Sequence, residues 1–203
     1  MQGAVREFES KHGRIPGGEL LVLGLGRLGG GVLTHASDLD IVYLFTGDFA
    51  ARSDGERPLG ATQYFNRLAS RVSAALSVPT AQGALYEVDT RLRPQGNQGP
   101  LAVSCEAFAK YQREAAWTWE HMALARARVL AGSPAARAQL DAILAEVIRA
   151  PRDAATLRTA VVEMRERMAQ HKQPGGALDA KLLRGGLVDC EFIVQFLQLR
   201  GLD

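Results

Sequence analysis

Two aspartates separated by one residue, Asp38 and Asp40, have the residue type and spacing best suited to chemistry in this sequence. They open an apolar run that ends at Phe45, which reads as a strand. Successive side chains of a strand point to opposite faces, so both carboxylates are expected on one face. Two like charges about 7 Å apart along a strand repel each other unless a cation lies between them. Such a pair suits Mg²⁺ bound together with a nucleoside triphosphate.

A glycine-rich turn precedes the two aspartates and follows a strand-like apolar run from Leu20 to Leu23. Its glycines are Gly24, Gly26, Gly29, Gly30 and Gly31. A turn of this composition after a strand is typical of a phosphate cradle. The sequence therefore predicts a phosphate site beside a pair of carboxylates.

The same turn has a rival interpretation as a dinucleotide-binding fingerprint. Gly24, Gly26 and Gly29 fit the pattern GxGxxG, and Asp48 lies near the distance expected for a ribose-binding acid. That fold needs a crossover helix of about a dozen residues before the next strand, whereas only residues 30–37 are available. The order of strand, glycine turn and Ser-Asp-x-Asp strand is instead typical of nucleotidyltransferases, which is the interpretation we favour.

A third carboxylate is predicted at Asp89, on a strand expected over residues 84–91. Glu87 shares its face and is the substitute candidate. Together with Asp38 and Asp40, Asp89 completes the ligand set expected for two Mg²⁺ ions in nucleotidyl transfer. In that chemistry a ligand carboxylate, here Asp89, takes the proton from the attacking hydroxyl.

Two arginines, Arg91 and Arg93, flank the turn that follows this strand. Each either holds triphosphate oxygens or forms a surface salt bridge to Glu87 or Glu106, and the sequence leaves both roles open. Other charged residues have simpler explanations, because they suit helix ends. These residues are Arg126 and Arg128, at a predicted C-terminus, and Asp189 and Glu191, in a predicted first turn.

Amphipathic patterns and breakers predict the helices that must position these residues. They are expected over residues 2–12, 62–76, 115–130, 135–149, 154–171 and 187–200. One more helix is expected to begin after Ser104, which is its predicted N-cap. The apolar stripe of the last helix has few later residues to cover it, which suggests an unfinished helical bundle.

Composition limits the classes of protein. The net charge of +2 gives no field suited to a polyanion, so nucleic-acid binding has no compositional support. Two cysteines without disulfide or zinc spacing fit a reducing cytosol. No apolar run approaches the roughly 18 residues of a membrane span, and no secretion signal is evident, so we expect a cytoplasmic protein.

Four segments of the chain together resemble the glutamine synthetase adenylyltransferases, bifunctional bacterial enzymes of the DNA polymerase β nucleotidyltransferase superfamily. They are LGLGRLGGGVLTHASDLDIVYLF, LYEVDTRLRPQGNQGPLAVS, FAKYQREAAWTWEHMALARARVL and GGLVDCEFIVQFLQLR. The segment EAAWTWEHMALARARV is more similar to the domain that adds AMP to glutamine synthetase than to the domain that removes it by phosphorolysis.

This resemblance implies an α+β (α/β) fold, with a polymerase-β-like sheet and flanking helices over residues 1–131 and a partial helical bundle over 132–203. It implies ATP as substrate, Mg²⁺ as cofactor, a tyrosine of glutamine synthetase as acceptor, and a PII signalling protein as a regulatory partner of the full-length enzyme. The alternatives are an adenylyl-removing domain that phosphorolyses adenylyl-tyrosine and a catalytically silent regulatory domain.

The resemblance also assigns site residues. Asp38, Asp40 and Asp89 match the metal-binding carboxylates, and the predicted ATP-binding or phosphate-binding residues are Gly29, Gly30, Ser37, Arg91 and Arg93. The chain departs from the family pattern at two places. Arg27 replaces the usual lysine and keeps its charge, and an apolar segment around Val32 replaces a glutamate.

Overall fold

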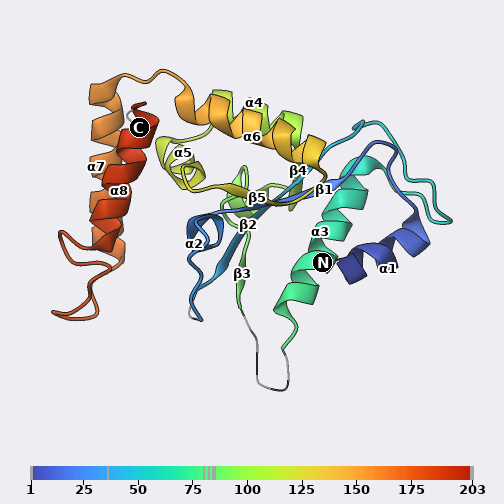
Figure 1. Cartoon of the computed structure of the whole chain (residues 1–203), viewed down its shortest axis with the longest axis horizontal. Helices are drawn as coiled ribbons and strands as arrows, with labels where there is room; N and C mark the ends of the chain where they lie inside the picture. Colours follow the sequence, from blue (N-terminus) through green and yellow to red (C-terminus); the bar gives the residue numbers. More distant parts are fainter. Residues whose placement is uncertain (1, 36, 80, 82, 84–85, 202–203) are drawn as a thin grey trace.

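The computed structural model describes residues 2–35, 37–79, 81, 83 and 86–201 (Figure 1). Its helices are α1 Gln2–His12, α2 Gly26–Gly29, α3 Ala61–Ser77, α4 Cys105–Glu114, α5 Thr118–Leu124, α6 Pro134–Arg149, α7 Ala154–His171 and α8 Leu187–Leu199. Its strands are β1 Leu20–Gly24, β2 Leu39–Phe45, β3 Val88–Asp89, β4 Ala102–Ser104 and β5 Arg128–Ala131, and a short 3₁₀ turn covers Gly96–Gln98.

The strands form an open, mixed sheet in the order β3-β2-β1-β5. β1 pairs antiparallel with both β2 and β5, with an irregularity between Val22 and Leu23 on the β5 side. β3 and β4 both pair parallel with β2, β3 near its start and β4 near its end. The register places Asp40 directly opposite Asp89, so two strands far apart in sequence bring two predicted site carboxylates together.

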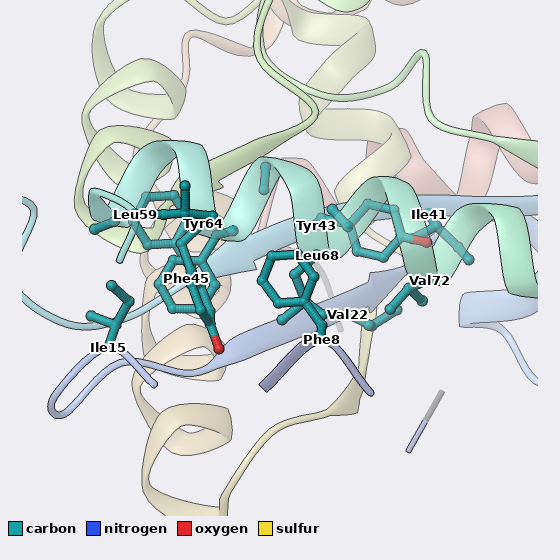
Figure 2. Packing of buried hydrophobic residues seen from close by; sticks show 14 of the residues in the cluster. Phe8, Ile15, Val22, Ile41, Tyr43, Phe45, Leu59, Tyr64, Leu68 and Val72 are labelled. Atoms are coloured by element: carbon teal, nitrogen blue, oxygen red, sulfur yellow. The ribbon is translucent and has the colours of Figure 1, made fainter. Parts of the chain in front are cut away.

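Helices cover both faces of the sheet (Figure 1). The predicted apolar face of β2 is confirmed, because Leu39, Ile41, Tyr43 and Phe45 all belong to one buried cluster with α1 and α3. Figure 2 shows α3 lying along this cluster. Here Phe45 stacks on Phe65 with ring centroids 4.6 Å apart. This packing fixes β2 and therefore the strand end that carries the aspartates.

The opposite face of β2 is also buried. Val42 and Leu44 pack in a second cluster with Phe108 of α4 and Leu140 of α6. α6 therefore packs directly against the sheet, because its buried residues belong to the same hydrophobic cluster as β2. The expected division of the chain at residue 132 stays a prediction.

The single helix predicted over residues 115–130 is wrong. The structure has the short helix α5, which ends at Leu124, followed by strand β5. The physical reason is that one edge of β1 would otherwise have no strand to bond with, and residues 128–131 pair antiparallel with that edge. Val129 then packs into the core on one face of the sheet and Leu130 against the core on the other.

The other helices follow the sequence signals closely. The predicted N-cap is confirmed, because the Ser104 hydroxyl accepts a hydrogen bond from the Ala107 amide at 3.1 Å. β3 is shorter than the predicted strand. It spans Val88–Asp89, and residues 84 and 85 of the prediction lie outside the described residues.

α7 and α8 pack against α5 at one end of the sheet (Figure 1). A small core holds this group together, formed by Met122, Leu157, Val161 and Leu199. The predicted apolar stripe of α8 is only partly covered, since Val188 and Leu199 are buried whereas Ile193 is 59% exposed. Among the described residues, no helix has the length and apolar character needed to cross a membrane.

Candidate active site

A cavity of about 210 Å³ opens at the start of β2. Its lining comes from the glycine turn, the start of β2, the segment after α5, and the region from the α7–α8 loop into α8. The lining residues are Gly26, Arg27, Ser37, Asp38, Asp40, Arg126, Lys181, Leu187 and Glu191. The predicted carboxylate pair and Ser37 therefore lie in one cavity with part of the glycine turn.

Gly26 makes room for the carboxylate of Asp40. Its φ of +51° is in the left-handed region that favours glycine. A Cβ atom at this position would lie 2.3 Å from Asp40 Oδ2, which is closer than atoms can pack. The sequence pattern placed Gly26 in the turn but did not assign it to the site, because its contact with Asp40 depends on how the turn folds back over β2.

The two predicted phosphate-binding glycines have different surroundings. The amides of Gly29 and Gly30 donate to the carbonyls of Leu25 and Gly26, so both are paired within the turn. Gly29 is buried, and a Cβ there would lie 2.1 Å from the carbonyl oxygen of Arg126. Gly30 is exposed, and a Cβ there would lie 3.1 Å from the guanidinium end of Arg126 and in ordinary contact, at 3.5 Å, with the carbonyl oxygen of Gly26. Their predicted contact with phosphate stays a prediction.

Asp40 is half-buried among other acids. Burial is the main factor that raises the pKa of its carboxyl, and the charges of Asp89 and Asp38 raise it further. Arg91 and Lys181 lower this pKa in turn, but they do not cancel the effect of burial and of the neighbouring acids. A cation would relieve this repulsion.

We expect Asp40→Asn to raise the melting temperature at pH 7 in EDTA. An acid whose pKa is higher in the folded than in the unfolded protein destabilises the fold once it ionises, so the penalty is complete above the raised pKa. It disappears as the pH falls toward the ordinary aspartate value of about 3.9. Thermal unfolding of wild type and variant across this pH range measures the difference, which should shrink toward acid pH.

Asp141→Asn is the matched control for this prediction. Asp141 is an exposed carboxylate of α6, and no ion pair involves it in the described part of the chain. Its replacement should leave the melting temperature unchanged. If the melting temperature of Asp40→Asn at pH 7 is equal to or lower than that of wild type, the ionised Asp40 does not destabilise the fold.

Asp89 is held by Arg91. Arg91 Nε donates to both carboxylate oxygens, at 3.0 and 2.9 Å, and the Arg91 amide donates to Oδ1 at 2.8 Å. The side-chain hydrogen bonds from Arg91 are the largest cause that lowers the pKa of Asp89. The ion partner of Arg91 is thus Asp89, and neither Glu87 nor Glu106.

Arg93 is buried and bonds to its own turn. Its guanidinium donates to the carbonyl and the hydroxyl of Thr90 at 2.7 and 3.1 Å, and to the carbonyl of Gly99 at 3.4 Å. These bonds stabilise the loop that carries Arg91. Its predicted contact with triphosphate would require at least some of them to break.

The donor chemistry of the three aspartates fits Mg²⁺, which prefers carboxylate oxygens. As they stand, however, no three Asp, Glu, His or Cys side chains within the described ranges are gathered closely enough to hold a metal ion. Asp89 faces Arg91 instead. The predicted ligand triad would therefore need Asp89 to release Arg91, and it stays a prediction.

Besides Gly26 and Arg27 of the glycine turn, four lining residues were not predicted as site residues. Arg126 Nη1 donates to Glu191 Oε1 at 2.6 Å, and Lys181 and Leu187 line the same wall. The sequence offered simpler explanations for Arg126 and Glu191 as helix-end charges. Only the tertiary packing of α8 against α5 brings together residues 65 positions apart.

An open mixed sheet whose central strand carries two carboxylates beside a glycine turn defines the class of nucleotidyltransferase-like α+β folds. A family model described as glutamate-ammonia ligase adenylyltransferase matches residues 2–143. The chain therefore belongs to the glutamate-ammonia ligase adenylyltransferase family.

Curated relatives agree with this assignment. Proteins of Agrobacterium fabrum strain C58, Rhizobium meliloti strain 1021 and Brucella suis biovar 1 strain 1330 are each 48% identical to it, over 202, 200 and 202 residues. Each is named bifunctional glutamine synthetase adenylyltransferase/adenylyl-removing enzyme. The matches cover 99%, 98% and 99% of this chain but 20% of each relative, so the chain spans one fifth of their length.

Proposed function

We propose that this chain transfers AMP from ATP to a tyrosine hydroxyl of glutamine synthetase, with release of pyrophosphate, in a reaction that requires Mg²⁺. The observation that carries the proposal is the shared cavity of Asp38, Asp40 and the glycine turn. Family membership supports it, since the relatives are named for adenylyl transfer to glutamine synthetase. The resemblance of EAAWTWEHMALARARV to the adenylylating type of domain favours this direction.

Asp38, Asp40 and Asp89 would hold the metal, two ions by analogy with the superfamily. When bound, Mg²⁺ would neutralise phosphate charge during in-line displacement. The protein's own contribution is to hold carboxylates together despite their repulsion, by packing β2 and β3 in register.

Removal of the tyrosine proton is the other chemical requirement, because the pKa of a tyrosine hydroxyl is about 10. Asp89 is the proposed acceptor. In its present contacts Asp89 is a weaker base than a free aspartate, because Arg91 lowers its pKa. We therefore expect Arg91 to move from Asp89 to the phosphates of ATP in the reacting complex, which would restore the basicity of Asp89.

The test is transfer of labelled AMP from ATP to purified glutamine synthetase by the 203-residue chain with Mg²⁺. Label on the synthetase, lost when its acceptor tyrosine is replaced by phenylalanine, is the expected result. If ATP binds but no label appears, the proposed reaction is wrong for this chain.

The names of the relatives also include adenylyl removal, which favours one second candidate. In that reaction phosphate attacks adenylyl-tyrosine and releases ADP. Adenylylated glutamine synthetase incubated with phosphate separates the two reactions, since only the second candidate produces ADP.

The regulatory partner and the location belong to the same proposal. Control by a PII signalling protein rests on the family resemblance. A cytoplasmic location is consistent with Cys105 and Cys190, both of which are free thiols.

A further inference from the structure

The far wall of the cavity belongs to the α7–α8 region. Lys181, Leu187 and Glu191 face the same cavity as Asp38 and Asp40, although about 140 residues separate them in sequence. At about 210 Å³ the cavity is smaller than the roughly 300–1,000 Å³ typical of whole-ligand pockets. Its size therefore suits the phosphates of a nucleotide better than the whole molecule.

Lys181 forms no salt bridge within the described residues, and its charge acts on the carboxyls of Asp40 and Asp179, whose pKa values it lowers. Its main chain is fixed on both sides. Its amide donates to Asp179 Oδ1 at 3.0 Å, and its carbonyl accepts from the Val188 amide at 3.1 Å. The loop thus holds a lysine at the cavity while leaving its ammonium available.

The loop that carries Lys181 is itself built by several hydrogen bonds. The Asp179 carboxylate also accepts from the amides of Gly175 and Leu182, at 2.9 and 3.1 Å. The Asp189 carboxylate accepts from the Gly185 amide at 2.6 Å and pairs with Arg165 of α7. Both acids are therefore used to shape the loop.

Arg126 is the second cation of this wall. Glu191 of α8 fixes it through a 2.6 Å hydrogen bond, so α8 holds the guanidinium of a residue from the segment between α5 and β5. A Cβ on Gly30 would lie 3.1 Å from Arg126 Nη2, which places this guanidinium over the glycine turn. Asp38 and Asp40, at the start of β2, therefore line one small cavity together with the cations Lys181 and Arg126.

We infer that Lys181 and Arg126 bind the polyphosphate of the nucleotide, with Glu191 positioning Arg126. This inference rests on the proposed function. Cations of fixed position suit phosphate oxygens that a metal does not contact, because charge-assisted hydrogen bonds to phosphate are among the strongest available. The helical region would then complete the nucleotide site and not only pack beside it.

Calorimetric titration of MgATP and of adenosine into the 203-residue chain tests this inference. Lys181→Ala should weaken MgATP binding about tenfold, equivalent to about 1.4 kcal/mol, and should leave adenosine binding unchanged. Lys181→Arg should restore most of the affinity, because it keeps the charge. Glu191→Gln should also weaken MgATP binding without affecting adenosine.

Lys172→Ala is the matched control, since Lys172 lines a different groove between α7 and α8. It should bind MgATP as wild type does. If wild type binds MgATP and Lys181→Ala binds it equally well, the inference is wrong while the proposed function stands. If wild type binds no MgATP, the proposed function and the inference are both overturned.

Discussion

Replacing Asp38 and Asp40 together with asparagine is expected to lower AMP transfer at least about 1,000-fold, which corresponds to about 4 kcal/mol of transition-state stabilisation. Asparagine keeps the shape of both side chains but removes the charges that would bind Mg²⁺. No side-chain hydrogen bond of Asp40 is recorded among the described residues, and Asp38 is exposed. The fold should therefore survive, and the rate of labelled AMP transfer is the measurement.

Asp48→Asn is the control, and it also tests the dinucleotide interpretation. Asp48 is exposed, and its Oδ1 accepts from the Ala50 amide within its own loop. If the glycine turn were a dinucleotide fingerprint, Asp48 would bind a ribose, and its loss would weaken nucleotide binding. We expect no change in transfer. Transfer retained by the double variant would remove the two aspartates from the reaction.

Gly29→Ala is expected to destabilise the fold by about 3 kcal/mol or more, the upper range for inserting atoms into a packed interior. The added Cβ would lie 2.1 Å from the carbonyl of Arg126 and 2.6 Å from that of Gly24. Both are backbone atoms, so the turn would have to move away from the segment before β5 and from the end of β1. Thermal unfolding should show a fall of about 6–12 °C, given about 2–4 °C per kcal/mol for a chain of this size.

The adjacent Gly30→Ala provides the comparison. Gly30 has a helical φ of −71° and is exposed, and its nearest contact is the flexible end of Arg126. Alanine should change the melting temperature by no more than about 2 °C, since exposed sites are usually within about 0.5 kcal/mol. If both variants have the same melting temperature, the tight contact between the turn and the segment before β5 is not the reason that position 29 requires glycine.

Strands β1 and β2 and part of β3 could be predicted from the sequence because their signals are local, whereas β4 was not predicted. The apolar alternation along β2 indicated which residues face α3, and Ser104 indicated where α4 begins. β5 could not be predicted in this way. Residues 128–131 are compatible with a helix, and only the free edge of β1 makes them a strand.

The candidate site also contains residues with local sequence signals and residues that only tertiary packing brings together. Asp38 and Asp40 could be found because their spacing on one strand carries the chemistry, and Asp89 because a strand pattern surrounds it. The pairing of Arg126 with Glu191 and the approach of Lys181 had no local signal, because they depend on how α8 packs. The salt bridge between Arg91 and Asp89 was also not predicted, since the sequence suggested a glutamate as the ion partner of Arg91.

We propose Asp38 and Asp40 as the core of a metal-dependent nucleotide site. Calorimetric titration of ATP into the chain, in Mg²⁺ and then in EDTA, tests it most directly when the Asp38→Asn, Asp40→Asn double variant is measured alongside. We expect wild type to bind ATP in Mg²⁺, and we expect this binding to be lost in EDTA and in the variant. Equal binding of ATP by wild type and the double variant in Mg²⁺ would contradict it.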